Sequence, residues 1–81
     1  MITPEQIRAG RALLGITQAE LADRASISTT GLNNVERGNA DPKASTLRAI
    51  EAALTEAGVV FLDDGQSIDG GPGVRLAKIN R

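Results

Sequence analysis

Apolar residues recur at helical spacing in four segments of the chain, and the ends of these segments carry residues typical of helix ends. Thr3 and Thr17 are each followed three residues later by Gln or Glu, the capping-box pattern that begins a helix. Gly15 and Gly38 directly follow two of the segments and are expected to end those helices. The expected helices cover residues 4–14, 18–25, 29–37 and about 44–57. This pattern predicts a small helical bundle.

The pattern changes after Gly58. Val59–Leu62 is β-branched and aromatic, residues 63–73 are polar and rich in glycine, and residues 74–78 alternate with period two. These segments predict a strand, a loop and a second strand. We therefore expect a mainly α fold: a helical domain over residues 1–58, followed over residues 59–81 by a C-terminal β-hairpin or two short strands.

Composition excludes several classes of protein. The 81 residues include no cysteine and no histidine, which removes disulfide frameworks, zinc fingers and the commonest general base and metal ligand. Asp63, Asp64 and Asp69 lack the ligand spacing and terminal Glu of a calcium loop. We therefore expect no enzyme, no metal and no cofactor.

No apolar run approaches the roughly 20 residues that a membrane span needs, and the N-terminus lacks the layout of a secretion signal. The expectation is a cytoplasmic protein without a membrane partner.

Charge gives a mixed indication. Nine Lys and Arg residues stand against ten Asp and Glu residues, giving a net charge of −1. A nucleic-acid-binding domain is usually basic, so this balance argues mildly against such a function. The acidic excess lies after residue 50, whereas the first fifty residues are nearly neutral. Any affinity for DNA must therefore come from the local arrangement of side chains and from dimerisation.

Residues 18–37 form the most informative stretch, because they predict two short helices joined by a tight connection. Helices this short are not stable alone and must pack across each other. Apolar or small residues stand at the positions that this packing requires. They are Leu21, Ala22, Ala25, Ile27, Leu32 and Val35. This layout is typical of a helix-turn-helix, whose second helix enters the major groove of DNA.

Residues 5–58 resemble the lambda-repressor/Cro-like helix-turn-helix domains, also called the XRE family. The runs 18–22 (QAELA), 35–38 (VERG) and 46–50 (TLRAI), with the spacing between them, carry the resemblance. It implies a compact four-helix domain and a non-enzymatic transcriptional regulator that binds an operator in double-stranded DNA as a homodimer. Two positions depart from the usual pattern: Ser26 occupies the turn position often held by Gly, and Gly31 lies inside the third helix.

The third helix has two distinct faces. Leu32 and Val35 are expected to face the core, which directs Thr30, Asn33, Asn34 and Arg37 to the opposite side. Thr30 and Asn34 are four residues apart and therefore share one exposed stripe. Asn can bond the edge of adenine through two hydrogen bonds, and Thr can contact thymine or several other bases. The resemblance also points to Thr29, Thr30 and Asn34 as base-reading residues. The alternative is an ordinary solvated face.

Contacts to DNA phosphates are expected from polar side chains around this helix. Gln18 begins the preceding helix, where free N–H groups favour an anion, and the resemblance implies a phosphate contact there. The full set of expected phosphate-binding residues is Gln18, Asn33, Arg37, Asn39 and Lys43. Arg48 is a weaker candidate. The alternative for each residue is a surface role in solubility or at a helix end.

Arg11 and Glu36 are expected to form an ion pair. Arg11 borders the apolar stripe of the first helix, and Glu36 lies at the inner edge of the third. A partly buried Arg requires a carboxylate partner, and family relatives also show such a pair. Its expected role is structural and not catalytic.

The C-terminal segment is the expected dimer interface. Pairing of its strands across a two-fold axis would cover apolar residues and remove an exposed edge. The interface residues are expected to be Val60, Phe61, Leu62, Val74 and Leu76. The alternative is a hairpin folded back on its own helices. A second possible function is that of an antitoxin or adaptor, in which the same fold binds a toxin-like or other protein partner.

Overall fold

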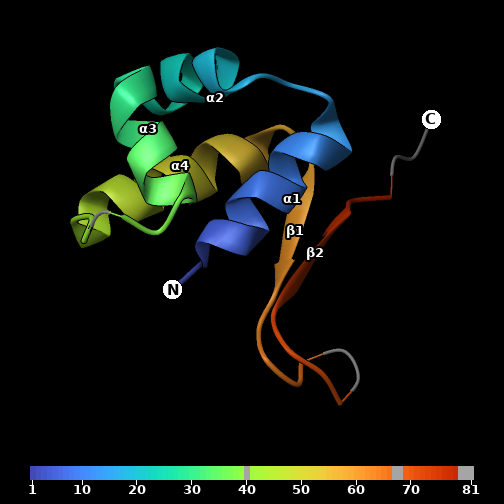
Figure 1. Ribbon diagram of the computed structural model, residues 1–81. Helices are drawn as coiled ribbons and strands as arrows, with labels where there is room; N and C mark the ends of the chain where they lie inside the picture. Colours follow the sequence, from blue (N-terminus) through green and yellow to red (C-terminus); the bar gives the residue numbers. More distant parts are fainter. Residues whose placement is uncertain (40, 67–68, 79–81) are drawn as a thin grey trace.

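The computed structural model describes residues 1–39, 41–66 and 69–78. Four helices precede two strands, as the sequence predicts (Figure 1). The elements are α1 (Pro4–Leu14), α2 (Gln18–Ala25), α3 (Thr29–Glu36), α4 (Ala44–Glu56), β1 (Val59–Leu62) and β2 (Gly73–Leu76). Several predicted bounds differ from the observed ones. Both α3, which Arg37 caps, and α4 end one residue earlier than predicted. The strand β2 begins one residue earlier, at Gly73, and ends two residues earlier, at Leu76.

Side chains cap three of the four helices, which explains why the sequence pattern located them well. Thr3 and Thr17 each form a complete capping box, with Gln6 and Glu20 as the reciprocal partners. The Ser28 hydroxyl accepts a hydrogen bond from the Gly31 N–H group at the start of α3. At the start of α4, Lys43 occupies the cap position and makes no side-chain cap hydrogen bond.

One apolar core joins the four helices to the hairpin. Ile7, Leu21, Leu32, Ile50 and Leu54 are fully buried at its centre. Phe61 and Val74 of the hairpin are partly buried against the same core. The side chains thus tie the hairpin to the helices, and burial of apolar surface is the main force that holds the two parts together.

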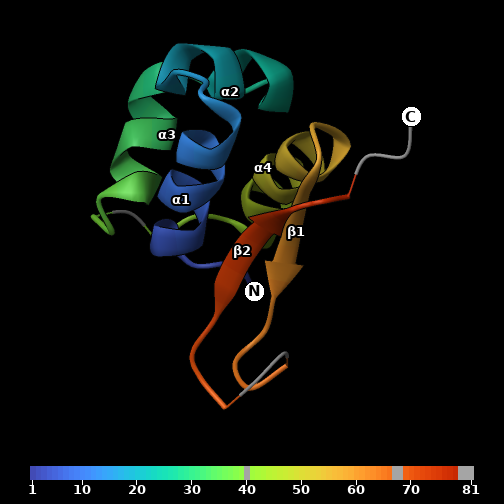
Figure 2. The same cartoon turned by 90° about the vertical axis from the view of Figure 1, so that its right-hand side faces the viewer.

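The two strands pair antiparallel within the chain, with Val59 opposite Leu76 and Leu62 opposite Gly73. In Figure 2 the hairpin lies across α1 and α4. The strands therefore pair within the chain, as in the alternative of a hairpin folded back on its own helices.

A buried amide also attaches the hairpin to α1. Gln6 is only 4% exposed. Its Nε2 donates to the Gly73 carbonyl at 2.9 Å and to the Leu62 carbonyl at 3.2 Å. Because its Oε1 accepts from the Thr3 N–H group, one side chain both takes part in the cap of α1 and holds the loop end of the hairpin, where Leu62 lies opposite Gly73.

Candidate nucleic-acid interface

The turn between α2 and α3 sets the crossing of the two helices. Ser26 ends α2 in the left-handed region, with φ of 59°, as expected for a turn position often held by Gly. It is the only non-glycine residue with positive φ in the part of the chain that the structure describes. The following Ile27 N–H donates to the Ala22 carbonyl at 3.0 Å. The chain thereby turns within three residues, and Ser28 caps α3, which begins at Thr29.

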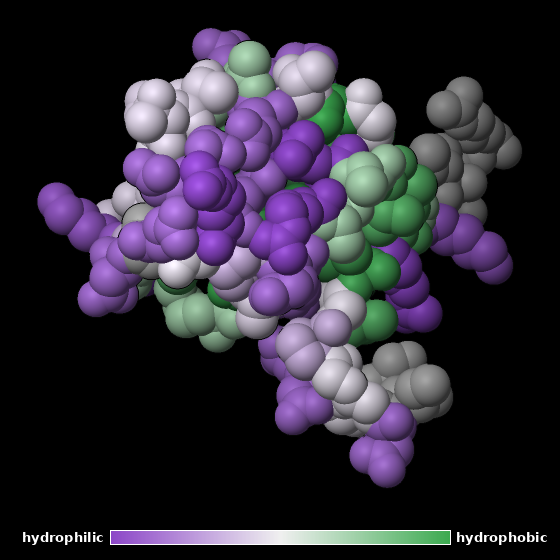
Figure 3. Space-filling view, viewed as in Figure 1, coloured by the Kyte–Doolittle hydropathy of each residue, from purple (hydrophilic) through white to green (hydrophobic). Residues whose placement is uncertain are grey.

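The two faces of α3 differ as predicted. Leu32, Val35 and Glu36 are buried. Thr29, Thr30 and Asn34 are exposed. The inner face fixes the helix against the core, so the outer face is a rigid polar ridge. Figure 3 shows hydrophilic side chains gathered over α1 and α3, in contrast to an apolar patch on the side of the hairpin.

The predicted ion pair between Arg11 and Glu36 is present and has bidentate geometry. Arg11 Nε lies 2.7 Å from Glu36 Oε2, and Nη2 lies 2.8 Å from Oε1. The Glu36 side chain is 2% exposed and that of Arg11 is 22% exposed. The hydrogen bonds that Arg11 donates to the Glu36 carboxylate raise the pKa of Arg11 above its ordinary value, so the guanidinium stays charged throughout the range in which proteins fold. The pair joins the end of α3 to α1.

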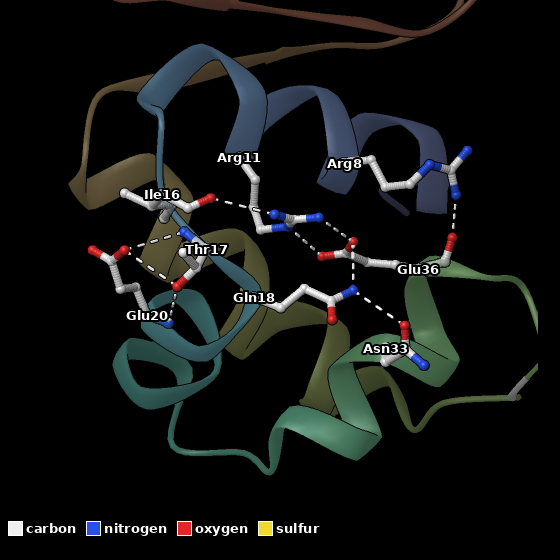
Figure 4. A network of polar contacts seen from close by, with 8 residues as sticks. All are labelled: Arg8, Arg11, Ile16, Thr17, Gln18, Glu20, Asn33 and Glu36. Atoms are coloured by element: carbon white, nitrogen blue, oxygen red, sulfur yellow. Dashed lines mark hydrogen bonds and ion pairs between the residues drawn. The ribbon is translucent and has the colours of Figure 1, made fainter.

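Gln18 extends this pair into a network, drawn in Figure 4. Its Nε2 donates to Glu36 Oε1 at 3.1 Å and to Asn33 Oδ1 at 3.3 Å. Arg8 adds a hydrogen bond from its guanidinium to the Glu36 carbonyl. Arg11 of α1 and Gln18 of α2 therefore converge on the buried carboxylate of Glu36, and Arg8 bonds to the backbone carbonyl of the same residue.

The other predicted phosphate-binding residues lie at the rim of α3. Arg37, Asn39 and Lys43 are exposed. Asn33 differs from the expectation of an outward-pointing residue, because it is half-buried and its side-chain oxygen accepts from Gln18. The five predicted residues thus form two groups: Gln18 and Asn33 are ordered by the network, and the other three extend into solvent.

Two contacts were not anticipated from the sequence. The sequence pattern marks Gln6 only as a capping residue, although its amide has N–H donors that a capping box does not use. No local pattern places the Arg8 guanidinium beside the C-terminal carbonyl of α3. Among the described residues, no group of His, Cys, Asp or Glu side chains could hold a metal ion. No helix in the described part of the chain has the length and apolar character to cross a membrane.

A short helix, a tight turn and a second helix with a free polar face define a helix-turn-helix protein. A family model described as "Helix-turn-helix" matches residues 7–56. The DNA-binding domain of the P22 C2 repressor, solved by nuclear magnetic resonance, is 33% identical, with a TM-score of 0.61 over 68% of this chain and 72% of that one. The chain therefore belongs to the lambda-repressor/Cro-like helix-turn-helix family, whose members are non-enzymatic regulators.

A curated relative agrees with this assignment. The immunity repressor protein of Bacillus phage phi105 is 37% identical over 54 residues, which cover 67% of this chain. The aligned stretch covers only 38% of the length of that phage protein. The similarity is thus confined to a part of the relative.

Proposed function

We propose that this protein is a sequence-specific DNA-binding transcriptional regulator that acts as a homodimer, with α3 in the major groove of an operator. The observation that carries the proposal is the rigid polar ridge of α3, with Thr29, Thr30 and Asn34 exposed while Leu32 and Val35 are buried. The family membership and the DNA-binding domain similar to this chain support it.

Base reading is assigned to the start and middle of the exposed ridge. The Asn34 amide can donate to and accept from one adenine edge, and the hydroxyl and methyl of Thr30 suit several bases. Thr29 is the first residue of α3, where recognition helices reach base edges. A bidentate contact is worth about 1–3 kcal/mol of discrimination between bases.

Phosphate contacts are assigned to the residues around this ridge. Lys43, Arg37 and Asn39 offer exposed donors at its C-terminal side. Gln18 and Asn33 are ordered by their mutual hydrogen bond, which lowers the entropic cost of ordering them on DNA. Such contacts position α3 and contribute no base preference of their own.

The hairpin is assigned to dimerisation. Of the five residues expected in the interface, Val60 and Leu76 have exposed side chains, at 36% and 47%. Leu62 is half-buried, whereas Phe61 and Val74 already pack against the core of their own chain. Leu76 shares its face of the hairpin with Phe61 and Val74, whereas Val60 lies on the opposite face beside Arg75. The interface is therefore centred on Leu76, and Val60 contributes only from the other face.

The test is selection of bound duplexes from a random DNA pool with the full chain, at two salt concentrations. The expected result is an enriched motif with two-fold symmetry, whose half-sites lie about 10 base pairs apart. Sequence-independent binding at both salt concentrations, or no binding at low salt, would overturn the proposal. The adaptor function would then be the better explanation.

Matched threonine variants locate the reading surface. Thr30→Ala on α3 is expected to weaken binding to the selected motif, whereas Thr55→Ala, also at an exposed helical threonine, is expected to leave it unchanged. Asn34→Ala is expected to relax the preference at one base pair with a loss of roughly tenfold or more in affinity. Lys43→Ala is expected to weaken binding to all sequences and reduce the salt dependence by about one phosphate contact.

A further inference from the structure

The outer edge of β2 carries backbone groups that no other strand pairs in the described residues. The Ala77 N–H donates to the Gly58 carbonyl at 2.7 Å. Given the register, the residues of β2 that bond to β1 are therefore Gly73, Arg75 and Ala77. The N–H and C=O groups of Val74 and Leu76 alternate with these and point away from β1. An open edge of this kind is a template for pairing with another strand.

Exposed apolar side chains gather beside this edge. Leu76 is 47% exposed, and Leu13 at the end of α1 is 42% exposed. They border a shallow hollow of about 300 Å³. Leu13, Leu14, Ala57, Gly58, Leu76 and Ala77 line this hollow. A large apolar side chain beside an unpaired edge is what a protein that stays monomeric avoids.

We propose that β2 pairs edge to edge with β2 of a second copy of this chain, with the two-fold axis at Leu76. This inference rests on the dimer of the proposed function and specifies its geometry. Leu76 then bonds to Leu76 of the second copy through both backbone groups. Val74 bonds in the same way to Lys78 of the second copy, and the same contact recurs on the other side of the axis.

Two neighbouring registers are chemically worse. An axis at Val74 places Leu76 opposite Pro72, which has no N–H group to donate. An axis at Arg75 sets two guanidinium groups directly opposite each other in a closely spaced pair, and like charges there are destabilising. With the axis at Leu76, Arg75 lies opposite Ala77 and the two leucines lie side by side.

The pairing produces a four-stranded sheet in the order β1, β2, β2, β1. The two-fold axis of an antiparallel pair is perpendicular to the sheet, so both helical layers lie on the same face. Leu13 belongs to that layer and lies close to Leu76, so that the apolar patches of the two copies cover each other. Both α3 helices belong to one side of the sheet, as reading one duplex requires.

Cysteine cross-linking tests the register, because the natural chain has no cysteine. In the proposed dimer the two Leu76 Cα atoms are about 5.5 Å apart, within the roughly 4.4–6.8 Å that a disulfide spans. Leu76→Cys in a glutathione redox buffer is therefore expected to form a covalent dimer. Arg75→Cys is the matched control, because its two copies are displaced by about 7 Å along the strands and are expected to cross-link poorly.

A proline variant tests the backbone hydrogen bonds without cysteine. In the proposed dimer the Lys78 N–H is used only between copies, so Lys78→Pro removes two hydrogen bonds from the dimer and none from the hairpin. Analytical ultracentrifugation is expected to show a dimer dissociation constant at least about tenfold higher than that of Lys78→Ala. Circular dichroism of both variants checks that the fold is retained.

The outcomes separate this inference from the proposed function. Preferential cross-linking of Leu76→Cys with weakened dimerisation of Lys78→Pro supports the pairing, even if the DNA selection fails. Equal cross-linking of both cysteine variants, stronger cross-linking of Arg75→Cys, or a monomer at tens of micromolar overturns it. In each of these cases an enriched DNA motif would leave the base-reading role of α3 standing.

Discussion

The helix α1 holds two neighbours by opposite means. Toward α3 it presents Arg11, which forms a bidentate ion pair with the buried Glu36. Toward the hairpin it presents Gln6, a neutral amide that donates to two backbone carbonyls. The charged contact fixes α3 against α1, and the neutral contact fixes the loop end of a two-stranded hairpin. One helix thus holds both the polar ridge of α3 and the hairpin that carries the proposed dimer surface.

The two attachments also differ in how much of the stability of the fold depends on each. Glu36 accepts hydrogen bonds from Arg11 and Gln18, so its loss leaves several donors unpaired at once. Gln6 supplements strand pairing and the packing of Phe61 and Val74. We therefore expect damage on the α3 side to be global, and damage on the hairpin side to be smaller and more local.

Removal of the buried carboxylate should have the largest effect. Glu36→Ala leaves Arg11, only 22% exposed, without its partner, and we expect a loss of about 3–5 kcal/mol in the free energy of unfolding. Thermal unfolding followed by circular dichroism should show a fall in Tm of roughly 15 °C or more.

An exposed ion pair on the same helix provides the control for this variant. Glu5 lies 3.9 Å from Arg8, and both side chains are largely exposed. Glu5→Gln should change stability by less than about 1 kcal/mol. Similar losses for Glu36→Ala and Glu5→Gln would contradict the importance assigned to burial.

Loss of the hairpin attachment should have the second largest effect on the free energy of unfolding. Gln6→Ala removes the hydrogen bonds to Leu62, Gly73 and Thr3, and we expect a cost of about 2–3 kcal/mol. Native-state hydrogen exchange should show faster opening of the strand amides than of the α3 amides. Thr3→Ala, which impairs only the cap of α1, is the control, and uniform acceleration in both variants would contradict a local role for Gln6.

Two serines in the turn before α3 should give the smallest effects, of opposite sign. Ser26 is in the left-handed region, so Ser26→Gly should raise stability by up to about 1 kcal/mol. Ser28 caps α3, so Ser28→Ala should lower stability by about 1 kcal/mol. Urea unfolding of both variants measures the difference, and the same sign for both would refute this description of the turn.

The helices were predictable because their signals are local, whereas the pair between Arg11 and Glu36, 25 residues apart, was predictable from the edge position of each residue together with the family resemblance. Capping boxes at Thr3 and Thr17 and a charged residue beside an apolar stripe can be recognised within a few positions of the sequence. The role of Gln6 could not be found in this way, because its partners lie 56 and 67 residues further along the chain. Pairing of the strands within one chain likewise depends on how the hairpin packs on α1 and α4.

The polar face of α3 was predicted correctly for Thr29, Thr30 and Asn34 and incorrectly for Asn33. Helical periodicity places Asn33 beside the exposed stripe, but it cannot show that Gln18 of the preceding helix reaches over it. Helix crossing decides this contact, and crossing angles are a tertiary property. Sequence patterns therefore locate α3 more reliably than they locate the side-chain contacts around it.

The loop that joins the strands makes the charge distribution of this nearly neutral molecule asymmetric. Asp63, Asp64 and Asp69 are exposed on it, and in both Figures 1 and 2 it projects away from α3. Residues 1–39 hold equal numbers of acidic and basic side chains. Under the proposed function, the phosphates of a duplex repel this loop, which favours encounters with the loop pointing away from the DNA. Added salt should weaken this orientation over a distance of about 10 Å.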